Sequence, residues 1–188
     1  GINLPDSALR LSALTAKDLA DLRFVVEHAD AVPYSFVRSA ADVHELQARL
    51  RELSGEDLAI VLKVETRPAF DHLPTLLLAA MRSRAVGVMI ARGDLAIECG
   101  FERLAEIQEE ILWVCEAAHV PVIWATQVLE SLTKEGVPSR AEISDAAVAG
   151  RAECVMLNMG PHVVKAVQVL EDILRRMQAH QHKKRSML

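Results

Sequence analysis

The stretch "LAIVLKVE", residues 58–65, is a run of aliphatic residues that ends in two charged ones, Lys63 and Glu65. A continuous apolar run, without alternation, is typical of a strand that is buried on both faces, as in parallel sheets covered by helices. Lys63 and Glu65 are two positions apart, so on a strand they point to the same face. The stretch therefore predicts a parallel α/β fold and a polar group where this strand ends.

The segments on both sides of this strand alternate between helical and extended patterns. Further strands are expected at 30–37, 85–91, 121–126 and 153–157, and helices at 15–29, 39–53, 69–81, 101–119, 139–150 and 161–180. Thr15 and Ser39 are predicted N-caps, and Pro74 is predicted to break or kink its helix. Gly150 is expected as a C-cap, and Pro161 at the start of the last helix. Strands separated by helices imply right-handed βαβ crossovers and a parallel sheet.

Five parallel strands can form a doubly wound open sheet or part of an eight-stranded barrel. No G-x-G-x-x-G follows the first strand, which removes the main signal for a dinucleotide-binding sheet. Five strands are too few for a complete (β/α)₈ barrel of roughly 250 residues. Residue 1 is Gly rather than Met, and we expect a fragment of a longer polypeptide. The expected architecture is a partial TIM barrel over residues 1–180, followed by a basic C-terminal tail over 181–188.

Composition narrows the class of protein. The 188 residues are 51% hydrophobic and 25% charged, which fits one globular domain. The net charge of −5 argues against nucleic acid as a partner. The cysteines Cys99, Cys115 and Cys154 are widely spaced and odd in number, so we expect reduced thiols. The apolar runs are too short to cross a bilayer, and we expect a cytoplasmic protein with no membrane partner.

Polar residues follow every expected strand at the same end. They are Ser35 and Arg38, Lys63 and Glu65, Arg92 to Asp94, Thr126 and Gln127, and Asn158. Because the carboxyl ends of parallel strands meet at one edge, these residues predict a site there. Simpler interpretations remain open, since Lys63 and Glu65 can form an ion pair with each other and Asp94 can be a turn residue.

Taken together, these groups suit a small oxyanionic substrate, such as a 2-oxo acid or an enol phosphate. Carboxylates on neighbouring strands, Glu65 and Asp94, can hold one Mg²⁺ and leave room for substrate oxygens and water. Lys63 can neutralise an anion bound to that metal. Gly93 allows backbone amides to approach an oxyanion, and Thr126 offers a hydroxyl.

Eight segments of the sequence, in order, resemble the pyruvate kinase family. They are "GINLPD" (1–6), "LSALTAKDLADLRFVVEHADAV" (11–32), "YSFVRSAADVHELQARL" (34–50), "LKVE" (62–65), "VMIARGDLAIE" (88–98), "VPVIWATQVLESL" (120–132), "PSRAEISD" (138–145) and "CVML" (154–157). The resemblance implies a (β/α)₈ catalytic barrel of which this chain holds about strands four to eight. "GINLPD" resembles the return from the small domain that the family inserts after its third strand.

The resemblance also implies a function and a role for individual residues. The full-length protein would be a glycolytic phosphotransferase that uses phosphoenolpyruvate and ADP to give pyruvate and ATP. Lys63 matches the catalytic lysine, and Glu65 and Asp94 match the ligands of Mg²⁺ or Mn²⁺. Gly93, Asp94 and Thr126 match the cradle of the phosphoenolpyruvate carboxylate, and Thr126 lies where the enolate is protonated. Ser35 matches a ligand of K⁺.

The sequence departs from the family in places that keep a second function open. Ala96 stands where the family has Gly, and "NMGPH" (158–162) replaces its Ser-Gly-Glu-Thr-Ala. The family's ATP-contacting residues lie on strands that this chain lacks, so the chain alone is expected to be inactive. The alternative is a catalytically incomplete, Mg²⁺-dependent module that binds phosphoenolpyruvate or a 2-oxo acid. Unpaired edge strands predict a homo-oligomer, such as a dimer, or pairing with the missing strands.

Overall fold

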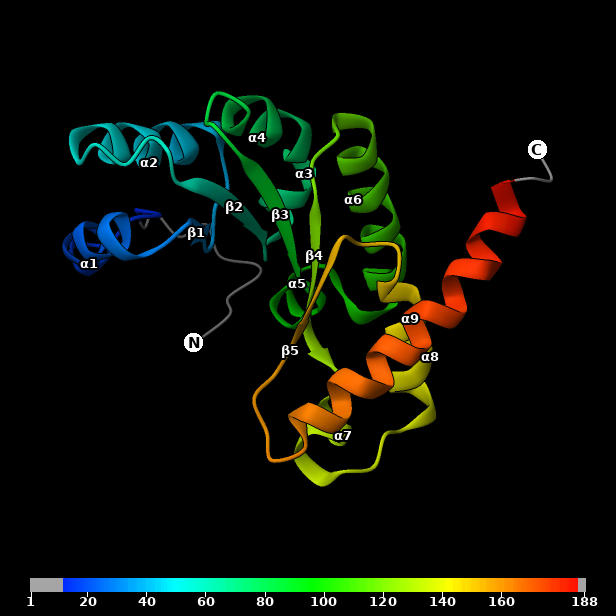
Figure 1. Cartoon of the computed structure of the whole chain (residues 1–188). Coiled ribbons are helices and arrows are strands. Elements are labelled where there is room, and N and C mark those ends of the chain that lie inside the picture. Colours follow the sequence, from blue (N-terminus) through cyan, green and yellow to red (C-terminus); the bar gives the residue numbers. More distant parts are fainter. Residues whose placement is uncertain (1–11, 186–188) are drawn as a thin grey trace. The chain divides into compact units, whose positions relative to one another are not determined.

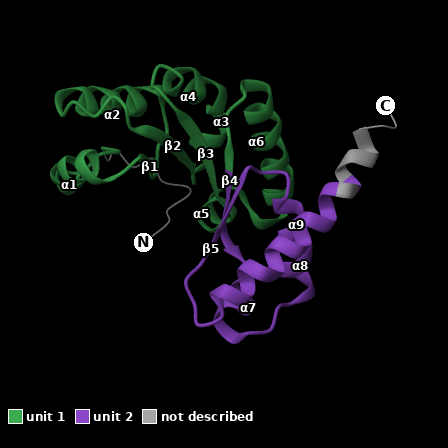
Figure 2. Ribbon diagram, viewed as in Figure 1, with its two compact units in different colours: residues 1–122 green, residues 123–188 purple. Residues whose placement is uncertain are grey.

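The computed structural model describes residues 12–185 of the chain. The segment "GINLPD" and the last three residues of the expected basic tail lie outside this range. The chain divides into two compact units, residues 1–122 (unit 1) and 123–188 (unit 2), which are coloured separately in Figure 2.

The strands form one parallel five-stranded sheet in the order β1-β2-β3-β4-β5 (Figure 1). They are β1 Ala31–Tyr34, β2 Ala59–Val64, β3 Val86–Ala91, β4 Val122–Val128 and β5 Cys154–Leu157. Each strand neighbours the next one in sequence, and helices connect them, as βαβ crossovers require. The five predicted strands and the parallel α/β fold are confirmed, and the open sheet agrees with a partial barrel.

Two helices of unit 1 begin at their predicted caps, whereas the helix expected from 69 begins at Arg67 and the one expected from 101 begins at Leu104. The helices of unit 1 are α1 Ala16–His28, α2 Ala40–Glu52, α3 Arg67–Asp71, α4 Leu73–Ala80, α5 Arg92–Cys99 and α6 Leu104–Ala118, with a 3₁₀ turn at Phe101–Arg103. Thr15 and Ser39 cap α1 and α2, and each forms a capping box with the Asp three residues later. Pro74 lies in the first turn of α4, where its missing N–H costs no hydrogen bond, and the helix expected at 69–81 is broken at His72, as the proline predicted. Helix α5 was not expected.

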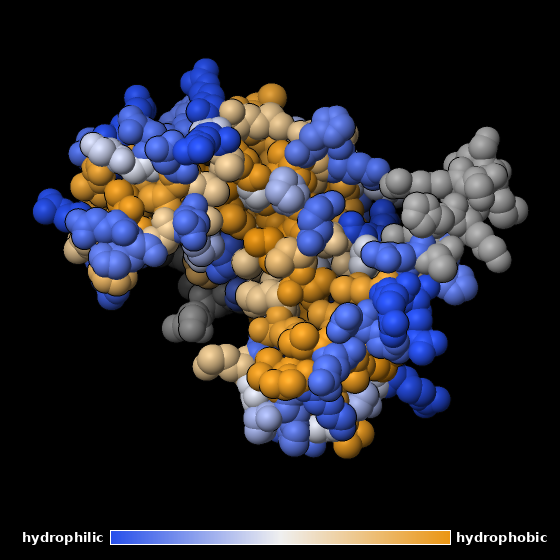
Figure 3. Space-filling view, viewed as in Figure 1, coloured by the Kyte–Doolittle hydropathy of each residue, from blue (hydrophilic) through white to orange (hydrophobic). Residues whose placement is uncertain are grey.

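The strand at 59–64 is buried on one face only, so the expectation of burial on both faces is wrong for β2. Ile60, Leu62 and Val64 are fully buried, whereas the alternating residues Ala59, Val61 and Lys63 are half-buried. The buried face belongs to the helix-covered core, in which α2 packs against α4 and α6 against β3. Figure 3 shows hydrophobic side chains gathered over the strands of unit 1 on the face turned to the viewer.

Unit 2 is built from three helices and two strands. Its helices are α7 Glu130–Glu135, α8 Arg140–Ala149 and α9 Val163–Arg185, and both α7 and α8 pack against α9. Gly150 is the C-cap of α8, as expected, but its φ of −63° is not left-handed. Helix α9 runs to Arg185, so residues 181–185 of the expected tail continue the helix. Within residues 12–185, no helix is long and apolar enough to span a membrane.

Candidate active site

Three strands of unit 1 bring polar residues to the carboxyl edge of the sheet. In the parallel register Tyr34 pairs with Leu62, and Val64 pairs with Ile90. Ser35, Glu65 and Arg92 each follow the last residue of their strand. The parallel arrangement therefore places the predicted residues of β1, β2 and β3 along one edge, as expected from the sequence.

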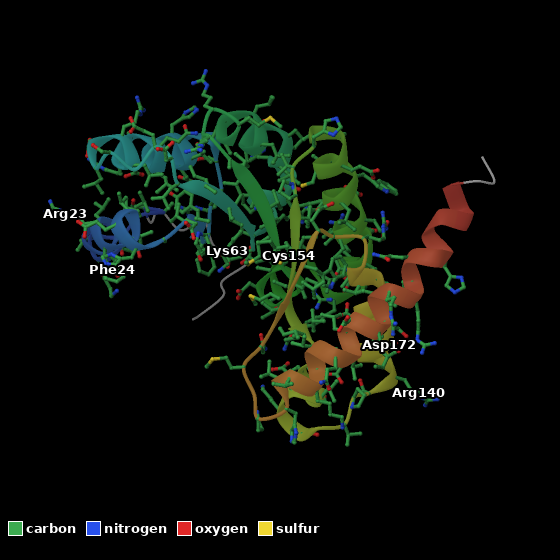
Figure 4. The ribbon with its side chains drawn as sticks, viewed as in Figure 1. Arg23, Phe24, Lys63, Arg140, Cys154 and Asp172 are labelled. Atoms are coloured by element: carbon green, nitrogen blue, oxygen red, sulfur yellow. The ribbon has the colours of Figure 1, made fainter. Side chains whose placement is uncertain are left out.

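Lys63, Glu65 and Ser35 form a connected polar group at this edge, and Figure 4 shows Lys63 at the end of β2. The Nζ atom of Lys63 lies 2.6 Å from Oε1 of Glu65 and donates to Oγ of Ser35 at 2.8 Å. The side chain of Glu65 is 2% exposed and that of Lys63 24% exposed. The ion pair considered from the sequence is therefore present and mostly buried. These contacts use two of the three donors of the ammonium group.

A backbone donor that the sequence did not indicate completes the contacts of Glu65. The N–H of Phe36 donates to Oε2 of Glu65 at 2.6 Å. Phe36 has a φ of 52°, a left-handed conformation that is costly for a residue with a Cβ atom. Costly backbone conformations of this kind persist where the surrounding structure demands them and are common at functional sites. The turn that follows β1 thus helps to fix the orientation of the Glu65 carboxylate.

Gly93 and Asp94 lie in the first turn of α5, not in a loop. The helix begins directly after β3, with Ala91 as its N-cap and no capping side chain. Arg92 is buried, whereas Gly93 and Asp94 are half-buried. The first N–H groups of a helix have no partner within the helix and carry a partial positive charge, which favours an oxyanion. Helix α3, which begins just after Glu65, contacts α5, so the two carboxylate-bearing segments are neighbours.

The chemistry of two carboxylates suits a magnesium ion, but Oε1 of Glu65 already pairs with the ammonium of Lys63. The carboxylates of Glu65 and Asp94 are the hard oxygen ligands that Mg²⁺ prefers. Among the described residues no group of three or more His, Cys, Asp or Glu gathers in one place, so a metal ion here would have two protein carboxylates and would need water or substrate oxygens as further ligands.

Ser35 fits its implied role as a K⁺ ligand less well. Its Oγ atom accepts a hydrogen bond from the ammonium group of Lys63 at 2.8 Å. A second cation on this oxygen would lie close to a like charge, which Coulomb repulsion disfavours. In this arrangement the hydroxyl serves to hold Lys63.

Thr126, the remaining predicted site residue, belongs to unit 2 and lies in an irregular part of β4. Trp124 pairs with Val155 and Val128 with Leu157, so three residues of β4 face one residue of β5. Thr126 is half-buried, and the next residue, Gln127, has a φ of 58°. Bulges of this kind turn side chains away from the regular pleat and are frequent beside active sites.

The loop at 158–162 packs against α7 and is hydrogen-bonded to it. The N–H of His162 donates to the carbonyl oxygen of Thr133 at 3.0 Å. A Cβ atom at Gly160 would lie 2.3 Å from the same oxygen, so only glycine fits there.

Asn158, the first residue of this loop, contributes to the environment of Glu130. A hydrogen bond from Lys134 is the main cause that lowers the pKa of Glu130. Burial opposes this effect, and hydrogen bonds with Gln127 and Asn158 reinforce it. Sequence reasoning missed Glu130, although its position four residues before Lys134 on a helix is a usable signal.

Comparison with known proteins agrees with this architecture. Residues 1–167 match the family model described as pyruvate kinase, barrel domain. The chain is 37% identical to a pyruvate kinase of Dictyostelium discoideum over 181 residues, which are 93% of this chain and 34% of that protein. It is 37% identical to pyruvate kinase 1 of Trypanosoma brucei brucei, over 97% of this chain and 37% of that protein. It is 36% identical to plastidial pyruvate kinase 3 of Arabidopsis thaliana, over 95% of this chain and 31% of that protein.

The chain thus spans about a third of the length of the curated relatives that it matches, and the matched region covers most of the residues described above. The family model, the relatives and the parallel sheet with its polar carboxyl edge lead to one assignment. The chain belongs to the pyruvate kinase family, and its residues 1–167 match the barrel domain of that family.

Proposed function

We propose that the full-length protein transfers the phosphoryl group of phosphoenolpyruvate to ADP, giving pyruvate and ATP. The observation that carries this proposal is the mostly buried Lys63–Glu65 pair at the carboxyl edge of the sheet, beside the strand that leads into the helix of Asp94. A half-buried lysine that is held by two oxygens is well oriented to meet an anionic group. Membership of the pyruvate kinase family supports the same reaction.

Each residue has a defined part in this proposal. The ammonium of Lys63 would lie beside the oxygens of the transferring phosphoryl group and offset their negative charge. The N–H groups in the first turn of α5, at Gly93 and Asp94, would donate to the carboxylate of phosphoenolpyruvate. Glu65 and Asp94 would hold Mg²⁺ or Mn²⁺, which supplies positive charge to the oxygens of the substrate. Thr126 would help to deliver the proton that converts enolpyruvate to pyruvate, a role that rests on the family resemblance alone.

A second function is favoured by the loop at 158–162. In the family this segment reads Ser-Gly-Glu-Thr-Ala, whereas here Gly160 and His162 are used to hold the loop against α7. A protein that keeps the residues of the carboxyl edge but has lost the nucleotide side would bind phosphoenolpyruvate or a 2-oxo acid without transferring phosphate. Such a protein would be an Mg²⁺-dependent binding or regulatory module.

The kinase proposal is tested by replacing Glu65 with Gln in the full-length protein. Pyruvate formation from phosphoenolpyruvate, ADP and Mg²⁺ should fall at least about 100-fold, since one of the two proposed carboxylate ligands of the metal is removed. Glu98→Gln is the matched control, because it makes the same change in the helix of Asp94 at a residue with no proposed role. Wild-type turnover in E65Q would contradict the proposal.

The two functions are separated by a second measurement on the wild-type protein. Oxalate, a mimic of the enolate, is titrated by calorimetry in the presence of Mg²⁺, and ADP-dependent turnover is assayed on the same sample. Binding with turnover supports the kinase. Binding without turnover supports the module, and the absence of both contradicts both proposals.

A further inference from the structure

A cavity of about 370 Å³ opens at the other edge of the unit 1 sheet. Its walls come from the second half of α2, from the segment before β2 and from the segment that joins α4 to β3. Since residues 56–58 and 82–84 precede their strands, the cavity lies at the amino edge, opposite Lys63 and Glu65. The length of β2, six residues at about 3.3 Å each, separates it from the candidate active site.

The charged groups of this cavity are mostly cationic. Three arginines, Arg51, Arg82 and Arg84, line it together with a single acidic residue, Glu56. The chain as a whole carries a net charge of −5, so this excess of positive charge is local. Clefts lined by charge of one sign attract ligands of the opposite sign.

Two of these arginines have no acidic partner among residues 12–185. The Nε atom of Arg51 donates to the carbonyl oxygen of Gln47 at 3.3 Å, and no hydrogen bond or ion pair is made by the side chain of Arg82 within the described residues. Arg84 pairs with Asp57 at 2.7 Å, but the two side chains are 69% and 87% exposed. An exposed pair of this kind is weak and is readily exchanged for another anion.

The segments that carry the arginines are tied together. The Nε2 atom of Gln47 donates to the carbonyl oxygen of Ala79 and to Oγ of Ser83, both at 2.9 Å. These bonds attach the turn that bears Arg82 and Arg84 to the helix that bears Arg51. Because Ser83 accepts this bond, its own O–H is left to donate to a ligand. Leu50 and Leu58 are buried beneath, which keeps the wall rigid. Preorganisation lowers the entropic cost of binding.

We propose that this amino-edge cavity binds a phosphate group, as free phosphate or as a small phosphomonoester. Guanidinium groups match the oxygens of phosphate in bidentate geometry, which is why arginine is preferred for its recognition. The volume lies in the range of small-molecule sites, about 300–1,000 Å³. Because the arginines are exposed, binding should be weak and should decrease as salt is added. The inference does not depend on the reaction proposed above.

The test compares two double variants that remove the same charge. The cavity variant, Arg51→Gln with Arg82→Gln, removes the two arginines of the cavity that have no acidic partner in the described part of the chain. The control variant, Arg23→Gln with Arg140→Gln, removes two exposed arginines outside the cavity, which are labelled in Figure 4. Inorganic phosphate and glycerol 1-phosphate are the probes, titrated by calorimetry at low salt. The cavity variant should weaken saturable binding at least about 10-fold, which is 1.4 kcal/mol, and the control variant should bind as the wild type does.

Several outcomes distinguish the sources and the alternatives. Tighter binding of glycerol 1-phosphate than of phosphate would assign the cavity to an ester, and equal binding would assign it to the free anion. No saturable binding of either probe, or equal weakening in both double variants, would overturn the proposal. Binding of a polyglutamate peptide without binding of phosphate would also overturn it, in favour of an acidic protein segment.

A measurement on the wild type keeps the proposal testable even if the cavity variant fails to fold. Phosphate should shift the backbone amide signals of residues 82–84 in ¹⁵N-resolved NMR spectra. Shifts confined to residues 92–94, at the start of α5, would place the anion at the carboxyl edge and would contradict the proposal.

Discussion

The two edges of the unit 1 sheet handle charge in opposite ways. At the carboxyl edge the carboxylate of Glu65 is nearly inaccessible, and both its oxygens accept from Lys63 and Phe36. At the amino edge three arginines surround an open cavity, and two of them have no acidic partner among the described residues. A buried charged group therefore needs an opposite charge or hydrogen-bond partner within the protein, whereas an exposed one can remain available to a ligand.

The largest expected loss of stability comes from replacing Lys63 at the carboxyl edge. Lys63→Met should lower the free energy of unfolding by about 3 kcal/mol, because it leaves a buried carboxylate without its cation. Urea denaturation of the chain measures this loss. Lys17→Met is the matched control, since Lys17 pairs with Asp21 on the exposed surface of α1. This variant should lose much less free energy of unfolding than Lys63→Met does. Equal losses in the two variants would remove the distinction between matched and exposed charge.

A smaller change in stability is expected from replacing Phe36 in the turn after β1. Phe36→Gly and Phe36→Ala both remove an exposed ring, but only glycine adopts a φ of 52° without steric cost. The glycine variant should therefore be more stable than the alanine variant by about 1 kcal/mol in urea denaturation. The same pair of changes at Phe24, which is exposed in helix α1, should give the opposite order, because glycine destabilises helices. If the alanine variant were the more stable one at both Phe36 and Phe24, the turn at Phe36 would not be strained.

The smallest expected effect is at the amino edge. Arg51→Gln with Arg82→Gln should leave the midpoint of thermal unfolding close to that of the wild type, because neither guanidinium has an acidic partner in the described part of the chain. Differential scanning calorimetry without added phosphate checks this. A loss comparable to that of Lys63→Met would mean that the arginines hold the fold together, and the contrast between the two edges would fail.

The parts of the fold that could be predicted are those with local signals. Thr15 and Ser39 mark helix starts because their side chains accept from the backbone three residues later. Polar residues after each strand indicated the carboxyl edge, because parallel strands must end together. Helix α5 escaped prediction because it begins at Arg92, directly after β3, and its N-cap Ala91 has no capping side chain.

The contacts that could not be predicted depend on backbone groups or on distant segments. The donor to Glu65 from Phe36 is a main-chain N–H, which every residue except proline carries, so no residue type indicates it. The amino-edge cavity is lined by three separate segments, two of which are joined by the hydrogen bond between Gln47 and Ser83, 36 positions apart. Neither residue belongs to a recognisable motif, and only the tertiary packing brings them together.

The close packing of Gly160 on Thr133 has a consequence for engineering of the loop at 158–162. If residues 158–162 are set against the family's Ser-Gly-Glu-Thr-Ala, as the resemblance implies, the glutamate of that motif falls at Gly160. Any side chain there would collide with the carbonyl oxygen of Thr133, a fully buried residue of α7 that has little room to move. Grafting the family loop onto this chain would therefore require a redesigned α7 as well. Gly160 and Thr133 are therefore coupled positions, and a side chain at Gly160 requires a matching change in α7.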